Sequence, residues 1–291
     1  DARRELEKEI QKKGGDTFYP PWDILRTETR EEDPAIVLTV TDEAGGVVRR
    51  MTAPVTGGFH RVAWDLRYPA ANPTSLAKPA ELSPWDRSPT GPLAAPGTYQ
   101  VSLAQRVAGK VTPLAGPVRF SVEVLGVSAL PPADRSATLA FQQKIARLQR
   151  AVLGAGESAR EAQRRLEHLK KALLDTPAAG ARLSDEARAI ESRLKDLQVA
   201  LGGDELLGEK NEPVPPAVQD RVNQVVGGAW YSTSAPTKTH QQCYDIAAVQ
   251  FAPVLEKLRA LIEVDLKRLE EQAETAGAPW TPGRVPTWKP E

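Results

Sequence analysis

The sequence predicts an immunoglobulin-like β-sandwich over residues 33–126, followed by an antiparallel helical bundle with long helices over residues 131–276. Two regions of different amino-acid composition predict this order. The first part is rich in Gly, Pro, Val and Thr, whereas residues 134–176 contain no proline and are rich in Ala, Leu and charged residues. Residues 1–32 are then expected to be an N-terminal linker, and residues 277–291 a tail rich in proline and tryptophan.

Short apolar runs in the first part predict five or more antiparallel strands with no helix between them, as in a sandwich of the immunoglobulin type. The segment FHRVAWDL is among them, because Val62, Trp64 and Leu66 alternate with Arg61, Ala63 and Asp65. The proline-rich interval 67–96 is expected to be an ordered loop. The predicted strands are IVLTVT (36–41), VVRRM (47–51), FHRVAWDL (59–66), APGTYQVSL (95–103) and PVRFSVEV (117–124).

Apolar residues in the second part are spaced alternately four and three, which predicts long helices that share a core. One such seam runs from Phe141 to Leu173, straight through Gly154 and Gly156, and indicates a single helix about 60 Å long. A second runs from Leu183 to Leu201, with Ser184 as the expected N-cap and Gly202-Gly203 as the stop. A third begins after Pro215-Pro216 and reaches Leu269, and Pro253 is expected to kink or interrupt it.

Composition excludes several classes of function. The 291 residues carry 38 basic and 38 acidic side chains, so a generic basic nucleic-acid binder is not expected. No apolar run is long enough to span a membrane, and DARRELEKEI is not a signal peptide. One cysteine and three widely separated histidines exclude a disulfide framework and a Cys-rich zinc site. No phosphate-binding or metalloprotease motif is present, so we expect no cofactor, no metal site and no catalytic residues.

The stretch VTDEAGGVVRRMTAPVTGGFHRVAWDLRYP, followed by GPLAAPGTYQVSL, contains D-x-x-G-x-V-x-R, G-x-x-x-V-x-W-D and P-G-x-Y-x-V. With these motifs, residues 17–130 resemble the C-terminal region of bacterial BNR-repeat, sortilin-like β-propeller proteins, often labelled glycosyl hydrolases. They are also similar to the Ig-like domain of flagellar hook-capping proteins. The resemblance implies a periplasmic or extracellular location and a link to a propeller through residues 1–30. The S-x-D-x-G-x-x-W repeats of the propeller are absent here, so a hydrolase activity would lie outside this chain.

The charged and aromatic stretch GGFHRVAWDLRYP (57–69) has a structural and a catalytic interpretation. His60 and Asp65 fall on opposite faces of an extended strand, whereas a base and its orienting acid need to lie in contact. We therefore expect Trp64 to fill the core, Asp65 to accept hydrogen bonds from backbone groups, and Arg67 to pair with an acid.

Two other groups are candidates for chemistry. Trp85, Asp86 and Arg87 lie in a predicted loop and are the candidate ligand-binding residues, because an exposed loop Trp can stack on sugar rings; alternatively, Trp85 closes the end of the sandwich. His240 and Cys243 share a helix face, yet no oxyanion donor accompanies them, so Cys243 is expected to be a core residue.

These observations predict a non-catalytic accessory or scaffolding region that mediates protein–protein interaction, as part of an exported β-propeller protein or associated with one. The alternative is a carbohydrate-binding module that uses the loop around Trp85. The expected partner is a protein, either a propeller in the same chain or in another one, or a second copy through the helices. No nucleic acid or membrane insertion is expected. Trp280 and Trp288 are expected to hold the tail against the rest of the protein.

Overall fold

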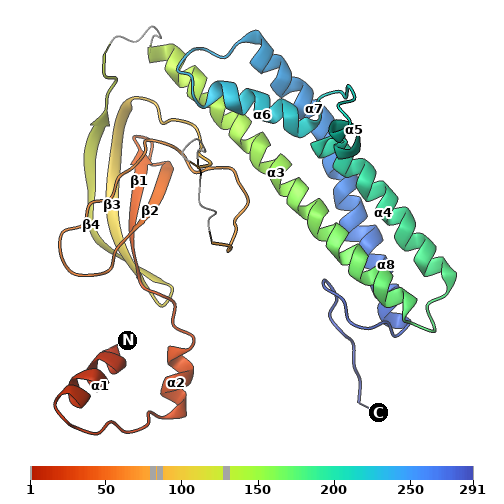
Figure 1. The fold of residues 1–291 in the computed structure, drawn as a ribbon. Helices are drawn as coiled ribbons and strands as arrows, with labels where there is room; N and C mark the ends of the chain where they lie inside the picture. The colour runs from red at the N-terminus through yellow and green to blue at the C-terminus, as the bar shows by residue number, and fades with distance from the viewer. Residues whose placement is uncertain (1, 79–82, 84–87, 127–131, 291) are drawn as a thin grey trace. The chain divides into compact units, whose positions relative to one another are not determined.

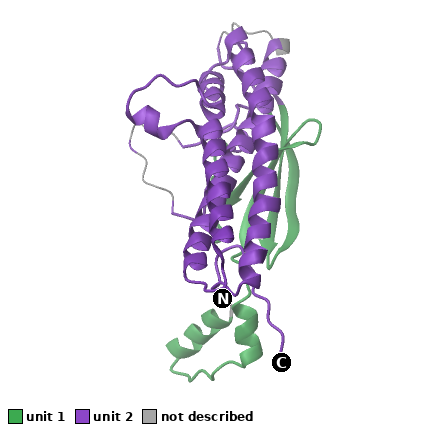
Figure 2. Ribbon diagram, turned by 90° about the vertical axis from the view of Figure 1, so that its right-hand side faces the viewer, with its two compact units in different colours: residues 1–64, 98–121 green, residues 65–97, 122–291 purple. Residues whose placement is uncertain are grey.

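The computed structural model describes residues 2–78, 83, 88–126 and 132–290. It contains a four-stranded antiparallel sheet and several helices, with 49% of residues in helices and 15% in strands (Figure 1). The chain divides into two compact units, shown in different colours in Figure 2. Unit 1 comprises residues 1–64 and 98–121, and unit 2 comprises residues 65–97 and 122–291. The proline-rich interval therefore belongs to the same unit as the long helices.

The sheet of unit 1 has the strand order β2-β1-β3-β4. Leu38 pairs with Met51 on one side and with Leu103 on the other, so these three side chains share one face. Thr39, paired with Arg50 and Ser102, belongs to the opposite, polar face. The structure has a strand at each of the predicted positions 36–41, 47–51, 95–103 and 117–124, although the third begins at Gly97 and continues to Val107 and the fourth begins already at Lys110. The observed strands are β1 (Ala35–Asp42), β2 (Val47–Ala53), β3 (Gly97–Val107) and β4 (Lys110–Val122).

The predicted strand at 59–66 is wrong, because this segment forms no regular secondary structure. Leu66 has a φ of 58°, which lies in the left-handed region and interrupts an extended strand. Trp64 nevertheless contacts the apolar face of the sheet, edge-on to Tyr99 with ring centroids 5.4 Å apart and to Phe120 at 6.2 Å. The expected core role of Trp64 is thus met by an irregular segment.

The N-terminal region, predicted to be a linker, contains the helices α1 (Ala2–Lys12) and α2 (Trp22–Glu28). Arg3 joins them, because its guanidinium donates to both carboxylate oxygens of Glu28 at 2.5 and 2.7 Å and also pairs with Glu7. This two-point contact fixes the direction of α2 relative to α1.

The helices of unit 2 pack around one cluster of buried apolar side chains that includes Leu166, Ile190 and Leu269. The structure confirms the long first helix, which continues for 43 residues through Gly154 and Gly156. The core uses the predicted seams of all three helical segments. The elements are α3 (Pro132–Leu174), α4 (Ala181–Gly202), α5 (Glu205–Glu209), α6 (Val218–Ala229), α7 (Lys238–Ala260), η1 (Leu261–Leu266) and α8 (Lys267–Thr275).

Three details differ from expectation. α4 begins at Ala181, so Ser184 lies inside the helix and is not its N-cap, although Gly203 ends it at a φ of 96° as predicted. α7 continues through Pro253, because buried residues on both sides, Phe251 and Leu258, hold the helix in the same core. The chain then forms a π-helix at η1. The buried Leu261 and Leu266 are five residues apart, and one π turn keeps both on the core side.

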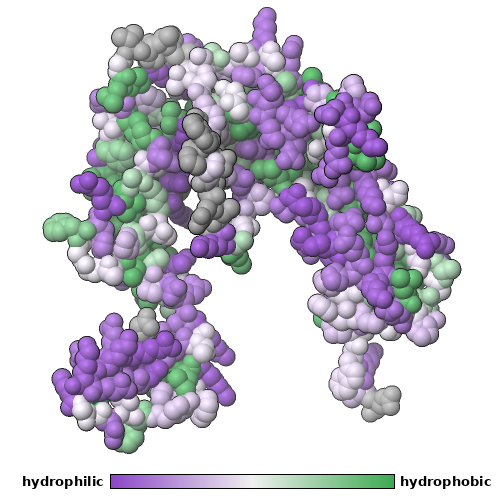
Figure 3. All heavy atoms as spheres, in the orientation of Figure 1, coloured by the Kyte–Doolittle hydropathy of each residue, from purple (hydrophilic) through white to green (hydrophobic). Residues whose placement is uncertain are grey.

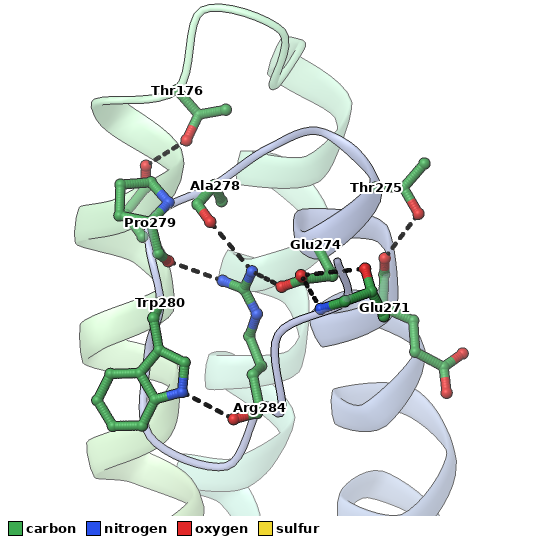
Figure 4. A network of polar contacts seen from close by, with 10 residues as sticks. Thr176, Glu271, Glu274, Thr275, Ala278, Pro279, Trp280 and Arg284 are labelled. Carbon is green, nitrogen blue, oxygen red and sulfur yellow. Dashed lines mark hydrogen bonds and ion pairs between the residues drawn. The ribbon is translucent and has the colours of Figure 1, made fainter. Parts of the chain in front are cut away.

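The C-terminal tail is attached through an arginine, so the expectation that its tryptophans hold it is wrong. Trp280 and Trp288 are 62% and 82% exposed, whereas Arg284 is buried. Figure 4 shows Arg284 paired with Glu274 of α8 and donating to the carbonyl oxygens of Pro279 at 2.9 Å and Ala278 at 3.1 Å. A guanidinium satisfies three acceptors at once here, which an indole N–H does not.

Candidate functional site

The stretch WDLRYP attaches residues 65–97 to the helices of unit 2. Arg67 donates to the carbonyl oxygen of Gly91 and to that of Trp230, each at 3.1 Å. Trp230 is the C-cap of α6, so the guanidinium caps a helix end whose carbonyls carry partial negative charge. The Arg67 Cζ atom also lies 5.7 Å from the centre of the Tyr231 ring. Asp65 accepts from the backbone N–H of Arg67 at 3.0 Å, as expected.

Trp230 also contacts the interval 65–97 through its own side chain. Its indole is buried, and its Nε1 donates to the carbonyl oxygen of Thr90 at 2.8 Å. Gly91 is required beside it, because a Cβ there would lie 2.4 Å from the Pro69 oxygen and 2.5 Å from the Tyr68 oxygen. We call this set, Arg67, Thr90, Gly91, Trp230 and Tyr231, the Arg67 junction. Its contacts join residues 65–97 to the end of α6.

A cavity of about 570 Å³ lies within unit 2, next to the Arg67 junction. Its walls come from the interval 65–97, the end of β4 with the residues after it, the first turns of α3 and the segment after Tyr231. Most lining residues are apolar, as in small-molecule sites, which are largely hydrophobic with a few placed polar groups. The apolar lining residues are Leu66, Leu93, Ala94, Pro96, Val122, Val124, Leu125 and Leu139.

One face of α3 supplies three polar groups of this cavity, and Glu123, Ser232 and Thr233 line it from other segments. Arg135, Thr138 and Gln142 follow one another at helical spacing, so they project from the same side. Gln142 is tied to α6 by a 2.7 Å hydrogen bond from its Nε2 to the carbonyl oxygen of Ala229. Thr138 is only 7% exposed, and its hydroxyl has no hydrogen-bond partner among the described residues. A buried hydroxyl without a partner is costly.

A second feature is a surface of exposed aromatic rings in unit 1, at and before the start of α2. Phe18, Tyr19 and Trp22 are 93%, 72% and 69% exposed, and we call them the N-terminal aromatic surface. Tyr19 and Trp22 contact each other edge-on at 5.8 Å. The ion pair that joins α1 to α2 favours the charged carboxylate, because the hydrogen bond from Arg3 lowers the pKa of Glu28.

The structure describes some of the candidate residues for chemistry and not others. Trp85, Asp86 and Arg87 lie outside the described residues. His60 is exposed, with Nε2 2.6 Å from the carbonyl oxygen of Thr56. Cys243 and Tyr244 pack against the buried cluster that contains Ile145 and Trp230, which confirms the core role of Cys243.

Metal sites, membrane-spanning helices and similar proteins were also sought. Within residues 2–78, 83, 88–126 and 132–290, no three His, Cys, Asp or Glu side chains are grouped to hold a metal ion. The helices in those ranges lack the combined length and apolar character needed to cross a membrane. Comparisons of the chain with family models, with curated proteins and with solved structures found no match.

The sequence analysis missed Arg135 and Thr138. A signal for Thr138 was present, because it lies three residues before Phe141 and so extends the apolar seam of α3 by one polar position. A polar residue at a core position is informative when it is buried. No sequence pattern around Arg135 indicated a site. Its importance comes from the helix face that it shares with Thr138.

Proposed function

We propose that this chain is a non-catalytic accessory region that docks onto a β-propeller of the BNR-repeat kind, in the same polypeptide or in another. The N-terminal aromatic surface is the observation that carries the proposal. Three aromatic side chains within five residues that are each more than two-thirds exposed are unusual on a monomer, and aromatic residues are enriched at protein interfaces. The Arg3–Glu28 contact holds the helices behind this surface together, which reduces the ordering cost of binding.

The strand β4 offers additional apolar surface in unit 1. It is the last strand of the sheet order, and Val111, Leu114 and Val118 are all exposed. Figure 3 shows apolar side chains gathered over the strands on the face toward the viewer. Exposed apolar side chains on an edge strand invite pairing with another chain unless they are covered. This supports a protein partner for unit 1.

We also propose the finer fold classes that the sequence predicted. The apolar sheet face with Trp64, Tyr99 and Phe120 supports an immunoglobulin-like sandwich core. The seams of α3, α4 and α7, buried in one cluster, support an antiparallel bundle. An extracellular or periplasmic location rests on the resemblance to propeller proteins.

Lysine cross-linking of the native protein from its source, followed by mass spectrometry, tests the docking. Lys8, Lys12 and Lys13 on and after α1 are exposed and report on the N-terminal region, and Lys267 on α8 is the accessibility control. We expect cross-links from the first three to peptides with the S-x-D-x-G-x-x-W repeat. Replacing both Phe18 and Trp22 by serine should reduce these cross-links and leave those of Lys267 unchanged. Cross-links confined to this chain or its copies would contradict the proposal.

A further inference from the structure

We propose that the cavity in unit 2 is a binding site for a small organic carboxylate with an apolar body. This inference is independent of the docking proposal, because its residues belong to unit 2 and the N-terminal aromatic surface belongs to unit 1. Three features carry it: the size of the cavity, its apolar walls, and two adjacent groups on α3 that are free to bind an anion.

The cavity volume of about 570 Å³ lies in the range of about 300–1,000 Å³ that is typical of ligand sites. Leu66, Leu93 and Leu139 project into it from two separate segments of the chain. The Arg67 junction fixes the first of these segments to the helices, so the walls are held in place before a ligand binds. A preformed apolar site favours a ligand whose body is a hydrocarbon chain or an aromatic ring.

The polar end of the cavity favours an anion. Arg135 and Thr138 lie one helical turn apart on the same face of α3, within its first two turns. Arg135 forms no ion pair in the part of the chain that the structure describes, and the Thr138 hydroxyl is buried without a partner. The beginning of a helix also carries partial positive charge. A carboxylate placed here would accept from the guanidinium with one oxygen and from the hydroxyl with the other.

Glu123 also lines the cavity and argues for the opposite charge, so its state decides between an acid and an amine. Glu123 is exposed, so water screens its charge. Thr138 is more buried than Glu123, and it lies one helical turn from Arg135 on α3. The recognition of a carboxylate is therefore favoured over that of an ammonium group.

Calorimetric titration of the full chain with decanoate, decanol and decylamine tests this directly, because the three share a hydrocarbon body and differ only in the head group. Each is kept below its micelle-forming concentration. We expect decanoate to bind at least tenfold more tightly than the other two, since hydrogen bonds to charged groups are the strong ones. Methyl resonances of Leu66, Leu93 and Leu139 should shift on binding, whereas those of Leu255 and Leu258 should not. No binding, or equal binding of all three compounds, would overturn the proposal.

Variants separate head-group recognition from loss of folding. Arg135→Gln should weaken decanoate binding about tenfold, while Arg147→Gln, an exposed arginine on the same helix, should leave it unchanged. Thr138→Val removes the hydroxyl at constant shape and should also weaken decanoate binding. Thr138→Ser keeps the hydroxyl and should retain most of the affinity for decanoate. An unchanged affinity in both Arg135→Gln and Thr138→Val, with circular dichroism equal to that of the parent chain, would show that the carboxylate is not recognised here.

Discussion

The guanidinium of Arg67 donates a hydrogen bond of 3.1 Å to the carbonyl oxygen of Trp230, a residue 163 positions later in the chain. This contact joins the irregular segment after Trp64 to the end of α6. It explains the charged stretch WDLRYP as a device that fixes one part of unit 2 to another. The contribution of this stretch can therefore be measured as a change in the free energy of unfolding.

Arg67→Leu should destabilise the protein by about 1–3 kcal/mol, because it removes the Arg67 hydrogen bonds to the carbonyl oxygens of Gly91 and of Trp230, the C-cap of α6. Urea denaturation followed by circular dichroism measures the loss. Arg61→Leu is the matched control, since Arg61 is an exposed arginine in the same stretch. Equal effects of the two replacements would contradict the capping role of Arg67.

Glu270→Gln should cost about 3–5 kcal/mol, since it leaves the guanidinium of Arg165 largely buried without its charged partner. The two side chains join α3 to α8 through hydrogen bonds of 2.9 and 2.7 Å. Asp185→Asn, at the exposed pair Asp185–Arg188, should cost under about 1 kcal/mol in the same denaturation experiment. Replacing Arg165 by Met and Glu270 by Leu together should recover most of the loss, and failure to do so would show that packing dominates.

Gly283→Ala should loosen the tail, because a Cβ at this position would lie 2.4 Å from Arg165 Nε and 3.0 Å from Glu270 Oε1. Its φ of 91° adds backbone strain. Gly277→Ala separates the two causes, since Gly277 has a φ of 75° with nothing within 4 Å of its added Cβ. Thermal unfolding should show a loss for Gly283→Ala that exceeds the loss for Gly277→Ala by about 1–3 kcal/mol. Equal losses would mean that strain alone acts.

Acidification should release the tail before the helices unfold. The backbone N–H of Thr287, at 2.9 Å, and the side chain of Arg284 lower the pKa of Glu274. A carboxylate whose pKa is lower in the folded state stabilises that state above its unfolded pKa of about 4.3, and this contribution is lost as pH falls through the folded pKa. The protection of the backbone amides of residues 281–290 against hydrogen exchange, relative to an unfolded chain at the same pH, should therefore fall below about pH 4. Glu274→Gln should show fast exchange already at pH 7, whereas Glu271→Gln should behave as the parent chain.

The helices were predictable because apolar spacing encodes which side of a helix is buried. Leu166, Ile190 and Leu269 were placed in the core from the sequence and are fully buried. The spacing did not reveal the π turn, which depends on how Leu261 and Leu266 meet a core already formed by other helices. A local pattern predicts one helix at a time, whereas the π turn depends on how several helices pack together.

The segment 59–66 was wrongly predicted to be a strand, because alternating apolar residues are a weak signal over so short a segment. Trp64 reaches the sheet from an irregular segment, so its apolar character was interpreted correctly and its backbone was not. The candidate cavity was out of reach of the sequence, because its walls come from segments far apart in the chain. Only the polar residue Thr138 on an apolar seam gave a sign of it.

The discontinuity of unit 2 has a consequence for synthesis. Residues 65–97 leave the ribosome long before α6 exists, so their attachment at Trp230 must wait for 163 more residues. At about 5–20 residues per second this delay is on the order of 8–30 s. During that time Pro92 and Ala94, which are buried in the folded chain, remain exposed. A nascent chain stalled near residue 200 should therefore bind a chaperone that recognises apolar segments, and one stalled well beyond residue 260 should not.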